Sequence, residues 1–552
     1  MNSLVGHVRE TAAVFGIVAR NSRLRLVVLA RLASVTGRWA ATVALGVFAY
    51  RHGGAQSVGV LAVARILPVV AAGPFTALLL KRFHSDRLLF AAGLARTAVV
   101  AGVAALMYAN AGNASLYVLV GLMALLSTMV RPLQSATLPY LVTTPHELTA
   151  TNLSLATIES FGMLLGPLVA GVIMSFSQPG AVLALTAALY GLSTLLVRLL
   201  PAPEIARKTG MTGFRETFDG LLAIHRDRRL RLVAGLYTAE NFVAGALNVL
   251  LVVAALNLLS LGNSGVGILN ATIGFGGLVA AFAAGAVIGR KRVASSLGLG
   301  LVLFGAPIAL IGAVPRTVST LLLLVLVGAG VAIVNFSSMT LLQRAIPDDA
   351  LASVFSMLQS LFVGTLGVGA LVAPVLVGQL GVRGALLVSG GALSVLAVLR
   401  WRPLILLDSE RADDDEAVDL LQGIPIFGPL PLPTLERLAR SLEPVDVPAG
   451  AVVVREGDEG DRYYAVRSGR VRVASSGQDV KVLGAGDGFG EIALLRDVPR
   501  TATVTALDDS RLYALDRDSF LECVAGTPSS RGAADELVDT RLAELRSVVA
   551  SI

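Results

Sequence analysis

Long apolar runs are the feature that most restricts the fold of this chain. A membrane-spanning helix needs ~20 mostly apolar residues. Runs of about this length recur twelve times, at 24–50, 57–80, 88–110, 115–138, 149–176, 181–200, 230–258, 265–289, 295–314, 318–342, 351–380 and 384–400. A buried soluble core is the alternative, but twelve successive runs leave no polar faces to meet water. We therefore predict an all-α polytopic membrane protein with twelve transmembrane helices, in two six-helix halves (24–200 and 230–402) joined by a cytoplasmic central loop (201–229).

The charged residues divide the chain into two regions. Residues 1–403 carry 29 Lys and Arg against 11 Asp and Glu, whereas residues 404–552 carry 16 against 27. The net charge of +7 therefore describes neither region and does not indicate a nucleic-acid-binding protein. Charged residues make up 15% of the chain, compared with ~25% in soluble domains, which excludes an ordinary soluble enzyme. We predict that an acidic, proline-containing linker (403–429) leads into a soluble domain (430–552).

Basic residues mark one alternate set of the predicted loops. This set holds Lys81, Arg82, the group from Arg226 to Arg231 and the group from Arg290 to Arg292, whereas the opposite set holds only Arg51, Arg316 and Arg383. Lys and Arg concentrate in cytoplasmic loops. Both termini and the C-terminal domain are therefore predicted to be cytoplasmic, in a multi-pass protein of the cell membrane, the inner membrane of a bacterium. Residues 1–23 form an N-terminal segment that either lies on the membrane surface as a helix or is disordered. We expect no signal peptide before the first span.

Residues that commonly form metal or catalytic sites are scarce. Cys523 is the single cysteine, and the five histidines show no ligand spacing. No set of nucleophile and base stands out either. We therefore expect no metal, no cofactor and no catalytic residues, and we do not expect an enzyme.

The first 400 residues resemble transporters of the major facilitator superfamily, and most of all the branch of bacterial drug, macrolide and siderophore exporters. The resemblance rests on Arg31 and Gly37 in the first span, on Arg131-Pro132 in the fourth, and on a small-residue run in the fifth that reads Gly162-x-x-x-Gly166-Pro167-x-x-x-Gly171. A partial echo of the fifth span in the eleventh fits a duplicated six-helix unit. One departure is Lys81, which stands where the superfamily has an Asp that helps to hold the cytoplasmic gate.

Four polar residues are candidates for the transport cavity. By the resemblance, the first, fourth, seventh and tenth helices line this cavity. Arg38, Glu159, Glu240 and Asn335 are predicted inside spans, where an ionisable group is costly and therefore usually functional. We expect Arg38 and Glu240 to contact the substrate or a coupled proton. The alternative is that an Arg–Glu pair only locks the two halves together.

The residues after 442 change to short β-type runs separated by glycines, which predicts an antiparallel roll. Within it, Gly486-Asp-Gly-Phe-Gly490-Glu491-Ile492-Ala493-Leu494 and the following Pro499-Arg500-Thr501 resemble the phosphate-binding cassette of cyclic nucleotide-binding domains. The resemblance covers the chain from about Leu430 onward. The expected nucleotide-binding residues are Gly490, Glu491, Ile492, Ala493, Leu494, Arg500 and Thr501.

The chemistry of these residue types agrees with the resemblance. An Arg fork such as that of Arg500 suits a cyclic phosphate, and we expect a short helix opened by Ala493 and Leu494 to direct free N–H groups at the same anion. In the family, the residue at the position of Glu491 accepts a hydrogen bond from the ribose 2′-hydroxyl. Thr501 leaves the base open, with cyclic AMP expected and cyclic GMP as the alternative. A surface ion pair between Arg500 and Glu491 on a scaffold that binds nothing is the structural alternative.

These predictions combine into a secondary active transporter, an exporter of a small amphipathic organic molecule, regulated by a cyclic nucleotide through a C-terminal lid helix (534–549). Its partners would be the lipid bilayer, the nucleotide and an unknown substrate, without nucleic acid; the oligomeric state stays open. One alternative is a membrane receptor for the nucleotide that no longer transports. Another is a transporter whose C-terminal domain serves assembly without a ligand.

Overall fold

A computed structural model describes residues 22–82, 85–109, 113–137, 145–199, 227–287, 293–346, 351–430, 432–525, 532 and 535–543. The chain divides into two compact units, a helical unit (Met1–Ile405) and an appended unit (Leu406–Ile552). Most of the N-terminal segment and of the central loop expected from the sequence lies outside the described residues.

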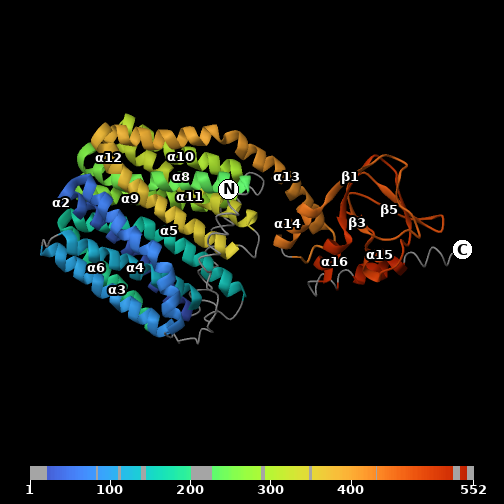
Figure 1. Ribbon diagram of the computed structural model, residues 1–552, viewed down its shortest axis with the longest axis horizontal. Helices are drawn as coiled ribbons and strands as arrows, with labels where there is room; N and C mark the ends of the chain where they lie inside the picture. The colour runs from blue at the N-terminus through green and yellow to red at the C-terminus, as the bar shows by residue number, and fades with distance from the viewer. Residues whose placement is uncertain are drawn as a thin grey trace. The chain divides into compact units, whose positions relative to one another are not determined.

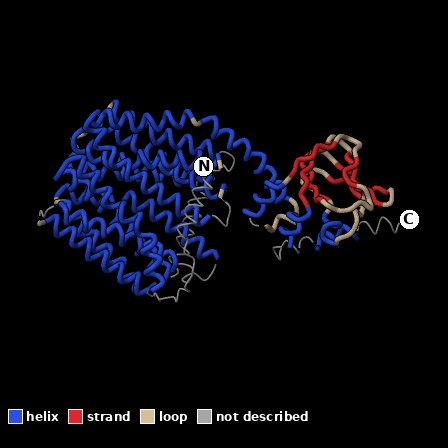
Figure 2. Tube along the Cα trace, in the orientation of Figure 1, coloured by secondary structure: helices blue, strands red, loops and turns tan. Residues whose placement is uncertain are grey.

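The helical unit is built of long apolar helices (Figures 1 and 2). In chain order they are α2 (Ser22–Arg82), α3 (Ser85–Tyr108), α4 (Asn113–Thr137), α5 (Pro145–Phe176), α6 (Pro179–Arg198), α8 (Arg228–Val253) with a π-helical turn (Ala254–Leu258), α9 (Gly262–Val287), α10 (Val293–Ala313), α11 (Thr317–Ala345) and α12 (Leu351–Leu399). Within the described residues, nine helices are long and apolar enough to cross a membrane.

Two of these helices contain glycine breaks. The backbone of α2 leaves the helical conformation at Gly53 and Gly54, and that of α12 does so at Gly381. Gly54 and Gly381 have positive φ angles of 61° and 69°, which glycine adopts without a steric penalty. The first break lies between the predicted spans 24–50 and 57–80, and the second lies between the predicted spans 351–380 and 384–400. Merging of these pairs is one reason why the count of nine is lower than the predicted twelve; the shorter apolar stretch Ser115–Thr128 of α4 is another.

The two halves of the helical unit pack through two equivalent pairs of helices. α5 packs against α9, and α12 packs against α2. In the first pair, a Cβ on Gly267 would lie 2.5 Å from the Cα of Gly171, so only glycine permits this approach. In the second pair, Gly59 approaches Ala370 and Pro374. The fifth and eleventh predicted spans therefore occupy matching places, as a duplicated six-helix unit requires.

The appended unit contains a roll of two antiparallel four-stranded sheets (red in Figure 2). One sheet has the order β1 (Glu443–Val447), β8 (Ser510–Asp516), β3 (Arg462–Ser468) and β6 (Gly488–Phe489). The other has the order β2 (Val452–Val454), β7 (Thr503–Ala506), β4 (Val471–Ser475) and β5 (Gln478–Leu483). The predicted β-type runs lie in these strands; β6, which is only two residues long, was not among them.

Side chains of β3 alternate between two hydrophobic cores, as the period of two in a strand requires. Val466 faces the core between the sheets, together with Phe489 and Leu512. Tyr463 and Ala465 face a second core, which they share with helices α13 (Trp401–Gly423), α14 (Leu432–Ser441) and α16 (Arg517–Ala525). The roll therefore rests on a helical layer.

The stretch predicted as an acidic linker is helical. Helix α13 runs through most of 403–429, and Ala417, Val418 and Leu421 are buried in the second core. Glu416 accepts two hydrogen bonds from Arg467 of β3, at 3.2 and 2.7 Å. The end of α13 thus belongs to the appended unit, because its apolar residues recur at helical spacing between the acidic ones.

Candidate functional site

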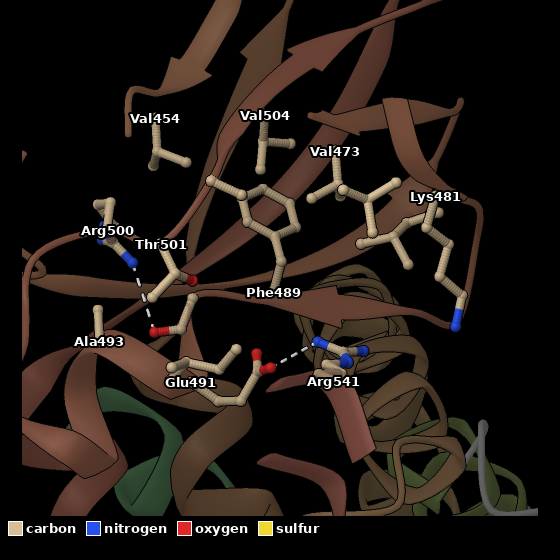
Figure 3. Close-up of a pocket in the computed structure, with 15 residues that line it drawn as sticks. Val454, Val473, Lys481, Phe489, Glu491, Ala493, Arg500, Thr501, Val504 and Arg541 are labelled. Carbon is tan, nitrogen blue, oxygen red and sulfur yellow. Dashed lines mark hydrogen bonds and ion pairs between the residues drawn. The ribbon is translucent and has the colours of Figure 1, made fainter. Parts of the chain in front are cut away.

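A pocket opens in the β-roll (Figure 3). Its wall is mostly apolar and includes four charged side chains, those of Lys481, Glu491, Arg500 and Arg541. The lining residues are Val454, Val473, Val480, Lys481, Leu483, Phe489, Gly490, Glu491, Ile492, Ala493, Arg500, Thr501, Ala502, Val504 and Arg541. An apolar, planar group and an anionic group can therefore be held in one place.

Gly490 permits the close approach of two elements in this pocket. It precedes the short helix α15 (Glu491–Arg496) and has a φ of 99°, in the left-handed region that favours glycine. A Cβ at this position would lie 2.6 Å from Nη1 of Arg500. Helix α15 begins at Glu491, two residues earlier than the sequence analysis expected. Any larger residue at 490 would strain the backbone and displace the guanidinium.

Arg500 is fixed in position by its hydrogen bonds. Its side chain is 3% exposed, and it donates to the carbonyl oxygens of Arg462 at 2.8 Å and Gly490 at 3.4 Å. The carboxylate that it contacts, Asp461, lies 3.3 Å away and is largely exposed. Neutral carbonyls and one exposed carboxylate compensate a buried cation only in part. The pocket therefore has a positive charge that an anion can complement.

Tyr464 packs beside this arginine. The Arg500 guanidinium carbon lies 6.0 Å from the Tyr464 ring, which stacks on Phe489. Burial, together with the negative charge of Asp461, raises the pKa of Tyr464. The ring is therefore neutral at physiological pH and offers its π-face to the cation.

Glu491 is the buried acid of the pocket. Glu491 is 1% exposed, and its Oε1 accepts a hydrogen bond of 2.7 Å from Arg541. The second oxygen, Oε2, is buried and has no hydrogen-bond partner among the described residues. A buried carboxylate oxygen without a donor is costly. A ligand hydroxyl donating to Oε2 would remove this cost.

Arg541 is the site residue that the sequence analysis missed. It lies in the helical segment 535–543 and also donates to the carbonyl oxygen of Gly488 at 2.7 Å. A second ion pair, between Arg496 and Asp539 at 2.9 Å, joins the same segment to α15. A lid helix is expected here from the sequence, but no local pattern distinguishes Arg541 from the other arginines.

The structure brings six of the seven expected nucleotide-binding residues to the pocket wall. These are Gly490, Glu491, Ile492, Ala493, Arg500 and Thr501. Leu494 instead faces the second hydrophobic core and is 2% exposed. Glu491 pairs with Arg541 rather than with Arg500, so the surface ion pair considered above is not formed.

The transport-cavity candidates lie within the helical unit, where Glu159 of α5 pairs with two arginines of α2. Arg31 donates to Glu159 at 3.1 Å, and Arg38 donates to the other carboxylate oxygen. Both arginines and the acid belong to the N-terminal half. Arg38 therefore pairs with an acid of its own half, and no ion pair between Arg38 and Glu240 that could lock the halves is formed among the described residues.

The other two candidates belong to the C-terminal half. Glu240 of α8 is 3% exposed. Asn335 of α11 accepts a hydrogen bond of 2.5 Å from Tyr237 of α8, one helical turn before Glu240. The side chain of Lys81, the expected departure from the superfamily pattern, lies outside the described side chains. Among the residues that the structure describes, no group of His, Cys, Asp and Glu is arranged to hold a metal ion.

Two family models match the chain. The model of the Major Facilitator Superfamily matches residues 27–367, more than half of the chain. The model of the cyclic nucleotide-binding domain matches residues 444–526, which include most of the pocket.

Curated relatives match the region of the appended unit. A cyclic nucleotide-gated potassium channel of Rhizobium etli is 43% identical over 96 residues, which is 17% of this chain and 27% of the channel. A CRP-like cAMP-activated global transcriptional regulator of Mycobacterium tuberculosis is 31% identical over 115 residues, 20% of this chain and 51% of the regulator. The chain therefore spans about half or less of the length of these relatives.

Solved structures match the same unit. The regulatory domain of Toxoplasma gondii PKA with cAMP is 33% identical, with 20% of this chain and 44% of that chain covered and a TM-score of 0.20. The Thermus thermophilus catabolite activator protein is 30% identical, with 23% of this chain and 63% of that chain covered and a TM-score of 0.21.

Proposed function

The chain belongs to the Major Facilitator Superfamily, and from this premise we propose that it is a secondary active transporter regulated by a cyclic nucleotide. The membership implies transport rather than catalysis. The observation that carries the regulation is the pocket itself, where a buried cation (Arg500) and a buried acid (Glu491) line one apolar cavity, and where one oxygen of this acid has no hydrogen-bond partner in the described part of the chain. Each of these two charged groups matches one part of a cyclic nucleotide.

The charge pattern of the pocket supports a separate position for each part of the proposed ligand. The cyclic phosphate carries one negative charge and would lie against Arg500, whose planar fork suits phosphate oxygens. The ribose 2′-hydroxyl would donate to Oε2 of Glu491. The base would lie against apolar lining residues such as Val473, Leu483 and Val504. Cyclic AMP is the proposed ligand, supported by the names of similar proteins, with cyclic GMP as the alternative.

The regulation would act through the C-terminal helical segment. Oε1 of Glu491 contacts Arg541 of this segment, while Oε2 would contact the ligand. Binding of the ligand to Glu491 would thus alter the contact between this carboxylate and the segment 535–543. A ligand can shift a conformational equilibrium only by its difference in affinity between the states. We therefore propose that the segment 535–543 takes different positions with and without nucleotide. This difference would bias the transport cycle.

The helix count and the loop charges support the proposed membrane arrangement, with both termini in the cytoplasm. Dividing α2 and α12 at their glycine breaks and counting α4 as a span gives the twelve spans expected from the sequence. An even number places both termini on one side, and the basic loops favour the cytoplasm. The resemblance to exporters supports export across the bacterial inner membrane. Arg38, Glu159, Glu240 and Asn335 remain the proposed cavity residues.

Calorimetry on the purified full chain tests the nucleotide site. Cyclic AMP, cyclic GMP and linear 5′-AMP are titrated at constant ionic strength, because phosphate binding depends on salt. We expect saturable binding of cyclic AMP and at least tenfold weaker binding of 5′-AMP. Absence of binding by both cyclic nucleotides would support the ligand-free assembly domain instead. Binding without any transport would support the receptor.

A further inference from the structure

Three arginines converge in the N-terminal half of the helical unit, on two helices near the middle of their spans. Arg38 and Arg65 belong to the two arms of α2, and Arg96 belongs to α3. The guanidinium of Arg96 lies 3.8 Å above the ring of Tyr190 in α6. Arg65 and Arg96 donate to Thr42 and Ser34 of α2, which lie one helical turn on either side of Arg38, so the three cations share one neighbourhood.

Negative charge in this half is too scarce to balance the cluster. Residues 24–200 contain only three acids, Asp86, Glu147 and Glu159. Asp86 is in the first turn of α3 and Glu147 in the first turn of α5, so both stand at helix ends. Glu159 alone is near the middle of a helix, and it already pairs with Arg31 and Arg38.

The other two arginines, Arg65 and Arg96, donate hydrogen bonds to neutral groups. Arg65 donates to the hydroxyl of Thr42 at 2.9 Å, and Arg96 donates to the hydroxyl of Ser34 at 3.2 Å. Arg96 is 3% exposed, and its Nε has no hydrogen-bond partner among the described residues. An ionised group inside a membrane protein is expensive unless an opposite charge or water compensates it. Hydroxyl groups supply hydrogen bonds but no opposite charge.

The arginine cluster is accessible at Arg38. The side chains of Arg38 and Glu159 are 38% and 30% exposed, in contrast to buried Arg96. A molecule that reaches Arg38 therefore meets a donor-rich region whose charge is positive. Guanidinium forks bind carboxylate and phosphate oxygens in bidentate geometry, which neutral or cationic molecules cannot match.

We propose that the transported molecule is an organic anion, whose carboxylate or phosphate binds between Arg38, Arg65 and Arg96 while its apolar part contacts the surrounding helices. This inference rests on the proposed transport function and refines it, because it names the charge of the substrate. Glu159 then holds Arg38 in the empty protein, and the substrate oxyanion competes with Glu159 for this arginine.

Binding of three naphthalene probes to the full chain in nanodiscs tests the proposal. 2-Naphthoate, 2-naphthamide and 2-naphthylmethylamine share one ring system and carry charges of −1, 0 and +1 at neutral pH. We expect 2-naphthoate to bind at least tenfold more tightly than the other two. The variant Arg65→Gln should lose this preference, and Arg65→Lys should keep part of it. Arg198→Gln is the matched control, because Arg198 lies in the last turn of α6 over Phe90.

The melting temperature without a probe separates this role from a structural one. If the cluster is an anion site, Arg65→Gln relieves repulsion and leaves the melting temperature unchanged or higher. A lower melting temperature, equal affinities for the three probes, or a preference that Arg65→Gln retains would each overturn the proposal. These outcomes do not depend on the nucleotide or on flux, so they leave the proposed regulation untouched. Failure of nucleotide binding would likewise leave the anion site untouched.

Discussion

The carboxylate of Glu491 bonds to Arg541 through one oxygen, at 2.7 Å, and its other oxygen is buried without a hydrogen-bond partner among the described residues. This relationship joins the turn at Gly490 to a helical segment fifty residues later in the chain. A ligand that donates to the second oxygen would therefore act on a group that already contacts the segment.

Substituting Glu491→Gln should weaken cyclic AMP binding roughly tenfold, which corresponds to ~1.4 kcal/mol. The ribose hydroxyl would lose a charged acceptor, and hydrogen bonds to charged groups contribute ~1.5–3 kcal/mol. The affinity for 2′-deoxy-cyclic AMP, which lacks the donor, should fall much less. Calorimetry with both ligands measures the difference, with exposed Glu459→Gln as the control. An equal loss for the two ligands would show that Glu491 does not contact the ribose.

Substituting Arg541→Met should loosen the C-terminal segment and weaken nucleotide binding. It leaves Glu491, whose side chain is 2% exposed, as a buried charge without its partner, and such losses cost ~3–5 kcal/mol. Hydrogen–deuterium exchange of residues 535–543 should become faster. Arg496→Gln is the control, because its pair with Asp539 is mostly exposed and should contribute ~0–1 kcal/mol. Equal exchange in the two variants would contradict the role given to Arg541.

Substituting Gly490→Ala should lower nucleotide affinity more than Gly486→Ala does. Both glycines have positive φ, 99° and 94°, so each substitution carries a similar backbone penalty of ~1–2 kcal/mol. A Cβ at 490 also meets Arg500 at 2.6 Å, whereas a Cβ at 486 meets nothing within 4 Å. The difference in nucleotide affinity between the two variants, measured by calorimetry, gives the effect of displacing Arg500. Equal affinities would indicate that the position of Arg500 does not matter for binding.

Substituting Arg500→Gln should reduce cyclic AMP affinity roughly a hundredfold, ~2.7 kcal/mol, because the phosphate would lose its buried charged donor. Arg500→Lys should fall between this variant and the wild type, since it keeps the charge but not the fork. The same titrations measure both. A wild-type affinity in Arg500→Gln would exclude Arg500 as the phosphate ligand.

The sequence predicted the elements of the appended unit better than their contacts. Runs such as Val452–Val454 consist of β-branched residues with glycines close to both ends, so the strands were visible in the pattern. The pairing of Glu491 with Arg541 was not, because it joins residues fifty positions apart and depends on how the C-terminal segment docks. Helix α13 was missed for a related reason: its acidic residues indicated a linker, while Ala417, Val418 and Leu421 are buried only once the roll is present.

In the helical unit, the sequence indicated which charged residues lie inside long apolar helices but not which residues they contact. Arg38 and Glu159 were both predicted from the cost of charge in a span. The partner of Arg38 depends on which helices are neighbours. Because α2 packs against α5, Arg38 pairs with Glu159 and not with Glu240. The arginine cluster around Tyr190 likewise requires three helices to be placed side by side.

Distance measurements between spin labels test the central proposal, that the nucleotide biases the transport cycle. The full chain with Cys523→Ser, its single cysteine removed, is labelled at Arg51→Cys, beside the glycine break of α2, and at Arg316→Cys, directly before α11; both positions are exposed, and they belong to opposite halves. Saturating cyclic AMP should shift the populations of the interlabel distances in nanodiscs, and Arg500→Gln should abolish the shift. An unchanged distance distribution under conditions where calorimetry shows full occupancy would contradict the account.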